Sequence, residues 1–276
     1  MSGASDFAAV ATAYFHDLQR RVCAAFEALE PHVRFTARSW TKPTGHRLQG
    51  GGESRLMRGA VFEKVGVNVS HVWGVLPPEA RGQVSGADLS EGRFTACGIS
   101  LVAHMVNPYV PAVHMNLRYL STSRAWFGGG SDLTPTFPFE EDTVDFHAAL
   151  RAACEAYRPG AYAQFKAWCD RYFYLPHRQE PRGVGGIFFD DLAGTECEQD
   201  FAFVRGVGEA FLEVYPRIVA RRKDSPYDDA AREQLLYKRG RYVEFNLVYD
   251  RGTRFGFSTD ADPDAYLMSL PPVVKW

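Results

Sequence analysis

Cysteine is scarce in this sequence and is not arranged for disulfides or for zinc. The chain of 276 residues holds five cysteines, an odd number, and none of them stands in a CxxC pair. A disulfide framework and a zinc ribbon both need cysteines in ordered pairs, so this usage argues against either. It favours a reducing compartment, and we expect a cytoplasmic protein.

Long apolar runs and an excess of one charge are also missing. No stretch reaches the roughly 18 apolar residues of a membrane span, and the N-terminus, with Asp6, lacks a basic region ahead of an apolar run. Lysine and arginine total 31 against 33 aspartates and glutamates. Without a global basic field, we expect no nucleic-acid partner and no membrane span, and local arginines must meet any acidic ligand.

The common cofactor and nucleophile motifs are absent. There is no GxGxxG at the start of a helix, no GxxxxGKS/T loop, no HExxH and no GxSxG elbow. The GVGG at Gly183 to Gly186 precedes a predicted strand instead of a helix, so it does not mark a dinucleotide site. What remains is chemistry by histidine, carboxylate and arginine, with no organic cofactor.

Hydrophobic periodicity predicts an α+β fold. Apolar residues recur every four positions from Val10 to Phe26, which indicates an amphipathic helix between Asp6 and Leu29. Further helices are predicted at 140–154, 162–174 and 201–219, and strands at 61–74, 93–105, 112–120, 183–192 and 241–257, the last with a hairpin turn at 250–252. Because these elements do not alternate regularly, we expect one domain over residues 1–276, a large, mainly antiparallel sheet with helices packed on it.

The strand at 112–120 carries a polar face. At period two, His114, Asn116 and Arg118 point to one side and apolar residues point to the other. In the strand before it, Ser100 and His104 share a face, so neighbouring strands would line a single cleft. An imidazole, an amide and a guanidinium suit an acidic small molecule. The alternative is a polar sheet face that meets only water.

The sequence also contains two glycine clusters, and a carboxylate follows the second of them. Gly50 to Gly52 is predicted as a connector. Gly128 to Gly130 is predicted to let the backbone approach a ligand closely, with the carboxylate of Asp132 beside it. The Thr134-Pro135 pair is predicted to end this segment. The alternative is an ordinary glycine turn.

Histidines and paired aspartates leave several roles open. Imidazoles on separate elements can converge on a metal, but each of these histidines taken alone fits a hydrogen-bonded, half-buried position. Asp190 and Asp191 are either a general-base pair or a turn anchor, and Asp250 with Arg251 fits a turn ion pair. The four candidate metal ligands are His104, His114, His147 and His177.

Five motifs together resemble the oxygen-dependent coproporphyrinogen III oxidases. They are HMNLRY, WFGGGSDLTP, RGVGGIFFDDL, RGRYVEFNLVYDRGTRFG and LMSLPPVVKW, and the similarity runs from about Trp40 to Trp276. The resemblance implies an enzyme of porphyrin and haem biosynthesis that converts the ring A and B propionates of coproporphyrinogen III to vinyls, giving protoporphyrinogen IX with release of CO2 and hydrogen peroxide. It implies O2 as co-substrate, a flat antiparallel sheet between helical layers, and a homodimer formed through strands near Tyr242 to Trp276.

Residue roles follow from matching motif positions. The resemblance places the family's proton donor at His114 and its substrate contacts at Ser100, Asn116, Leu117 and Arg118. It places the ligands of a divalent metal at His104, His114, His147 and His177. Asp132 is our own candidate for a carboxylate that orients or deprotonates a pyrrole N–H.

Two departures from the family pattern leave other readings open. Asp260, Ala261 and Asp262 stand where relatives carry a Gly-Gly-Arg loop, and the acidic tail that relatives carry past this point is not part of the sequence. One alternative is a non-haem iron oxygenase with two histidines and a carboxylate. The other is a tetrapyrrole-binding paralogue without catalytic activity.

Overall fold

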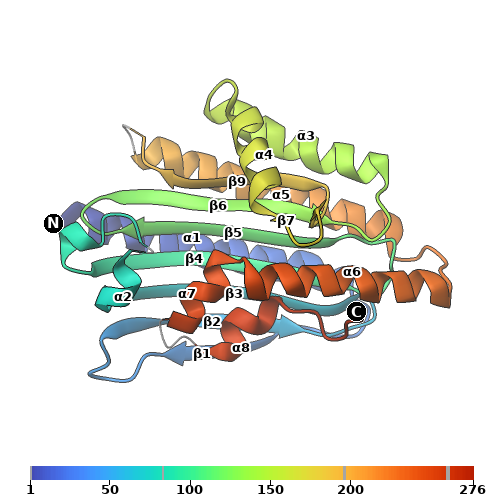
Figure 1. Cartoon of the computed structure of the whole chain (residues 1–276), viewed down its shortest axis with the longest axis horizontal. Helices are drawn as coiled ribbons and strands as arrows, with labels where there is room; N and C mark the ends of the chain where they lie inside the picture. Colours follow the sequence, from blue (N-terminus) through green and yellow to red (C-terminus); the bar gives the residue numbers. More distant parts are fainter. Residues whose placement is uncertain (1, 83, 195–196, 259–261) are drawn as a thin grey trace.

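A seven-stranded antiparallel sheet forms the centre of the fold (Figure 1). The computed structural model describes residues 2–82, 84–194, 197–258 and 262–276. Every pairing is antiparallel, in the order β1-β2-β3-β4-β5-β6-β9. The strands are β1 (Thr36–Thr41), β2 (Leu48–Met57), β3 (Phe62–Val75), β4 (Arg93–Met105), β5 (Ala112–Ser121), β6 (Ala125–Thr134) and β9 (Gly185–Leu192), and β7 (Tyr174–Leu175) pairs separately with β8 (Glu180–Pro181).

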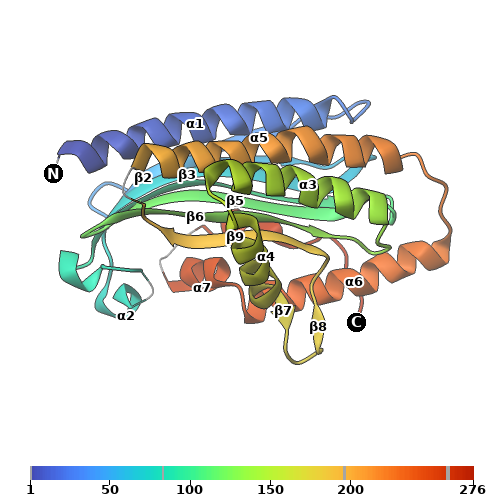
Figure 2. The same ribbon diagram turned by 90° about the horizontal axis from the view of Figure 1, so that it is seen from above.

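Helices cover both faces of this sheet, which confirms the α+β prediction (Figure 2). One face carries α1 (Ser2–Glu27), α3 (Glu140–Tyr157) and α5 (Cys197–Arg222). The other carries α6 (Asp229–Val248), α7 (Arg251–Ser258) and α8 (Pro263–Tyr266), while α4 (Ala161–Tyr172) lies against β9. The remaining short helices are α2 (Pro78–Arg81), η1 (Asp88–Ser90) and η2 (Leu267–Ser269). In the part of the chain described here, no helix is long and apolar enough to cross a membrane.

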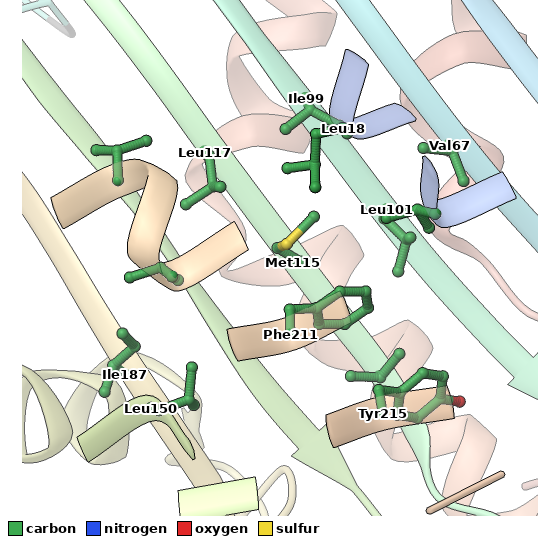
Figure 3. Packing of buried hydrophobic residues seen from close by; sticks show 14 of the residues in the cluster. Leu18, Val67, Ile99, Leu101, Met115, Leu117, Leu150, Ile187, Phe211 and Tyr215 are labelled. Carbon is green, nitrogen blue, oxygen red and sulfur yellow. The ribbon is translucent and has the colours of Figure 1, made fainter. Parts of the chain in front are cut away.

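The main core lies between the sheet and the layer of α1 and α5 (Figure 3). Alternate residues of each strand point into it, as the period of two requires. Met115 and Leu117 of β5 lie in the same core as Phe211 of α5, and all three are fully buried (Figure 3). Replacing such a buried side chain with alanine costs about 2–5 kcal/mol. The opposite, polar face of the same strands is therefore held in place by this core.

The predicted hairpin at 241–257 is wrong, because this segment is helical. Helix α6 begins after Asp228, whose side chain accepts a hydrogen bond from the Ala231 amide at 2.8 Å. Its buried residues include Leu235, Arg239, Tyr242, Val243 and Asn246, which follow a spacing of three and four. The alternation of apolar residues from Val243 to Tyr249 was compatible with a strand. The buried stripe of the helix, however, also contains Arg239 and Asn246, which a pattern based on apolar residues alone does not count as buried.

Both glycine clusters lie inside strands instead of turns. Gly50 to Gly52 belongs to β2, where a side chain on Gly52 would collide with the ring of Trp40 at 2.8 Å. Gly128 to Gly130 lies within β6, which ends at Thr134, just before Pro135, as the Thr134-Pro135 pair predicts. These glycines leave room above the sheet for bulky side chains of neighbouring strands.

Candidate active site

Strand register confirms that the predicted polar residues share one face. Asn116 pairs across the strands with Ser100 of β4, and His114 pairs with Asp132 of β6. Arg118 lies opposite Gly128. Because Met115 and Leu117 on the opposite face of β5 lie in the core with α1 and α5, the polar face is turned to the other side of the sheet, where α6 and α7 lie (Figure 2). Leu117 differs, because its side chain is fully buried in the main core and cannot contact a ligand on the polar face.

A chain of three side chains runs inward from this face. The carboxylate of Asp132 accepts a hydrogen bond from His114 Nδ1 at 2.9 Å. Arg182, just before β9, donates from one nitrogen, Nη2, to both Asp132 oxygens at 2.9 and 2.7 Å. The Asp132 side chain is only 1% exposed and that of His114 is 21% exposed. Asp132 therefore stands behind His114, which is the member that a ligand can reach.

The charge of Asp132 fixes the orientation of the imidazole. Burial raises the pKa of the Asp132 carboxyl, but the Arg182 guanidinium and the hydrogen bond from His114 outweigh it, so this pKa lies below its usual value. An ionised carboxylate only accepts hydrogen bonds, so the His114 Nδ1 must carry a hydrogen. Nε2 makes no hydrogen bond to the residues described, so it is the ring nitrogen left for a ligand at the polar face.

Arg182 is enclosed by aromatic rings. Its guanidinium carbon lies 4.0 Å from the ring centre of Phe173, 4.6 Å from Tyr242 and 4.7 Å from Phe245. Its Nη1 donates to the Asn246 side-chain oxygen at 3.2 Å. Sequence reasoning missed Arg182, although it opens the RGVGGIFFDDL motif. An unpaired charge would not be buried there, so the enclosure depends on the pair with Asp132.

A second cluster of charges lies further along the polar face. Arg118 Nη2 contacts Asp190 Oδ1 at 2.9 Å, and Arg251 Nη2 contacts the other oxygen at 3.2 Å. Burial raises the pKa of the Asp190 carboxyl, but the neighbouring Arg118 and Arg251 lower this pKa by more than burial raises it. The pKa therefore lies below its usual value, and the carboxyl stays ionised. Asp191 points instead to Arg124. Asp190 is thus not a free base but the partner of two arginines.

The four predicted metal ligands lie in four different environments. His104 Nε2 donates to the Ser269 carbonyl at 2.8 Å, and burial lowers its pKa to about 3. His147 contacts the Val184 carbonyl and the Tyr162 hydroxyl. His177 lies between Tyr249 and Glu244.

Within the described ranges, no three His, Cys, Asp or Glu side chains are grouped so that they could hold a metal ion. The histidines and their partners therefore do not fit a shared metal, and we assign no step to one. The same observation gives no support to a facial triad of two histidines and a carboxylate.

The C-terminal segment covers part of the polar face. Asn68 donates to the Ala265 carbonyl at 2.8 Å and Lys64 to the Leu270 carbonyl at 2.7 Å. Asp262, where the family pattern led us to expect an arginine, forms an ion pair with Arg38 at 3.1 Å. Asp260 and Ala261 lie outside the described residues. At Asp262 the expected cation is thus replaced by an anion that is already paired.

Two hollows are present elsewhere, and neither is lined by His114. A groove of about 490 Å³ separates α3 from α5 in the helix layer on the far side of the sheet, and its floor is formed by alanines and Gly206. A hollow of about 10 Å³, close to the size of one water molecule, lies behind Asp132 beside Cys169 and Arg182. Neither hollow is lined by Ser100, His114 or Arg118, so the candidate site on the polar face is distinct from both.

The fold and the site together define an α+β protein whose polar sheet face carries a histidine backed by a buried Asp–Arg pair, with a cluster of arginines further along. A family model described as coproporphyrinogen III oxidase matches residues 10–276. Proteins named oxygen-dependent coproporphyrinogen-III oxidase are 51% identical in Rickettsia bellii and 50% in Rickettsia conorii, each match covering 97% of both chains. The one from Rickettsia akari is 51% identical, covering 95% of this chain and 96% of its own. The chain belongs to the coproporphyrinogen III oxidase family.

Proposed function

We propose that this protein is an oxygen-dependent coproporphyrinogen III oxidase that converts the ring A and B propionates to vinyls. The observation that carries the proposal is the array of His114, Asp132 and Arg182 on the same sheet face as Arg118. The names and near-complete coverage of the relatives support it. The reduced tetrapyrrole is itself the electron donor, so O2 is the co-substrate and no organic cofactor is needed.

His114 is proposed as the proton donor. For each propionate, the carbon next to the ring gives a hydrogen with its electron pair to O2, and the carboxylate leaves as CO2 while a vinyl double bond forms. The peroxide anion then takes up one proton to become hydrogen peroxide. A protonated His114 supplies that proton from Nε2 while Asp132 holds Nδ1.

Asp132 and Arg182 act through His114 in this scheme. Asp132 is too deeply buried to reach a pyrrole N–H, so its proposed role is to fix the imidazole and stabilise its charged form. Ser100, Asn116 and Arg118 are proposed to contact the substrate, with the guanidinium of Arg118 directed at a propionate. Any contribution of Leu117 has to come from its backbone.

The test compares air with anaerobic conditions. Purified protein is incubated with coproporphyrinogen III, and the products are separated by chromatography and read by fluorescence. We expect vinyl products only with O2, loss of about 10²-fold or more in kcat for His114→Gln, and near-normal rates for His16→Gln on α1. Binding without turnover would indicate the paralogue without catalytic activity, and product formed without O2 would exclude the proposed reaction.

We further propose a homodimer and a cytoplasmic location. Because 241–257 is helical, the dimer cannot form through strands there. The segment from 242 to 276 nevertheless exposes apolar side chains, namely Leu247, Val248, Phe257, Val273 and Trp276. These side chains support a dimer contact formed by the segment from Tyr242 to Trp276. All five cysteines are free thiols, which suits a reducing compartment.

A further inference from the structure

Strand β9 has a bulge at the point where it passes the polar site. Phe127 pairs with Leu192 and Gly129 pairs with Phe189, so Gly128 alone faces Asp190 and Asp191. Asp191 adopts a left-handed φ of 57°. A bulge changes the direction of neighbouring side chains, and bulges are common beside active sites. Here the two carboxylates separate, one towards Arg118 and the other towards Arg124.

We propose that Asp190 is a positioning residue that holds Arg118 of β5 and Arg251 of α7 as a pair of cations for one substrate carboxylate. This inference rests on the proposed function. The Asp190 side chain is 12% exposed, whereas those of Arg118 and Arg251 are 30% and 57% exposed. The anion is thus buried beneath two cations that remain accessible.

The charges of this cluster suit an anionic ligand. Two guanidinium groups and one carboxylate leave a net charge of +1, which one propionate neutralises. Each arginine binds a different oxygen of Asp190, so the carboxylate keeps the two cations from moving apart. The backbone of Arg251 is also fixed, because its amide donates to the Tyr172 hydroxyl at 3.1 Å.

Gly128 provides the space for this arrangement. A Cβ at position 128 would lie 2.5 Å from Asp190 Oδ1 and 2.7 Å from Arg118 Nε. Both contacts are too close, so an alanine there displaces the pair without changing any charge. Gly206 on α5 is the matched control, since its Cβ would meet only Ala153 at 3.8 Å.

The experiment measures steady-state kinetics of the wild type, Asp190→Asn and Gly128→Ala, with Asp191→Asn and Gly206→Ala as controls. We expect KM for coproporphyrinogen III to rise about tenfold in both test variants while kcat changes less than about threefold, since substrate orientation is lost and the proton donor is kept. Both controls should stay within about twofold, because asparagine tolerates the left-handed backbone at 191.

A second measurement tests ligand binding and does not require turnover. Oxidised coproporphyrin III and its tetramethyl ester are titrated by fluorescence, and the preference of the wild type for the free acid should fall in both test variants. An unchanged KM and preference, or tighter binding of the acid by Asp190→Asn, would overturn the proposal. If Asp190→Asn fails to fold, Gly128→Ala decides. A wild type without turnover would instead refute the proposed function, while the binding measurement still tests Asp190.

Discussion

Arg182 donates from one nitrogen to both carboxylate oxygens of Asp132, and both side chains are almost completely excluded from solvent. The aromatic rings around Arg182 keep water away from the pair. The desolvation cost of two buried charges can match their attraction, so such a pair is weak evidence of stability. The consequence of the Arg182–Asp132 pair that matters for the site is that the Asp132 carboxylate is held behind His114.

Removing one member of this pair should be costly. Asp132→Asn leaves the guanidinium of Arg182 buried without its anion, so we expect a loss of about 3–5 kcal/mol in the free energy of unfolding. Urea denaturation followed by circular dichroism measures this change. The surface variant Asp191→Asn should stay within about 0.5 kcal/mol of the wild type. Equal stability of the two variants would mean that the pair is more hydrated than its burial indicates.

The polar face could be predicted from sequence because strand parity is a local property. The alternation from Ala112 to Leu120 placed His114, Asn116 and Arg118 together, and the short loop before the strand made it the neighbour of β4. Hydrophobic patterns also predicted the helices α1, α3, α4 and α5 and the α+β class. These signals depend only on a few adjacent residues.

The partners of those residues could not be predicted, because they come from distant parts of the chain. Arg182 lies 50 residues from Asp132, and Arg251 reaches Asp190 from a helix that was expected to be a strand. The spacing of His104, His147 and His177 likewise says nothing about which carbonyls and hydroxyls they contact. Only the tertiary fold decides whether such residues meet.

Acid should weaken the attachment of the β7–β8 turn to α6. Arg178 donates to Glu244 at 2.9 and 2.6 Å and lowers the pKa of that carboxyl to about 2, with His177 adding to the effect. This pKa is lower in the folded than in the unfolded chain, so its contribution to stability is complete above pH 4.5 and is lost as the pH falls towards 2.

The test is the difference in melting temperature between the wild type and Glu244→Gln. We expect the variant to melt lower at pH 6, and the difference to shrink as the pH falls from 4.5 to 2. Glu213→Gln, at an exposed ion pair on α5, should show little difference at any pH. A constant difference for Glu244→Gln would contradict the assigned ion pair.

The dimer contact can be tested with two valines of similar exposure. Val248 at the end of α6 is 56% exposed and Val10 on α1 is 54% exposed. A buried glutamate in an interface pays a desolvation cost, so Val248→Glu should shift a dimer towards monomer while Val10→Glu should not. Light scattering at micromolar concentration measures the mass. A wild-type monomer, or dissociation only by Val10→Glu, would contradict the proposed contact region.

Arg118 should matter for the reaction more than for folding. Its side chain is 30% exposed, and Asp190 keeps a second partner in Arg251 when Arg118 is removed, so Arg118→Ala should fold normally by circular dichroism. Loss of a hydrogen bond to a charged substrate group costs about 1.5–3 kcal/mol, which lowers kcat/KM by roughly 10- to 150-fold. Arg118→Lys should restore only part of this loss, because an ammonium group cannot bind two oxygens in the geometry of a guanidinium. Arg124→Ala, which removes the arginine paired with Asp191, is the matched control and should keep near-normal kcat/KM. Near-normal efficiency of a folded Arg118→Ala would show that the substrate carboxylate binds elsewhere on the polar face.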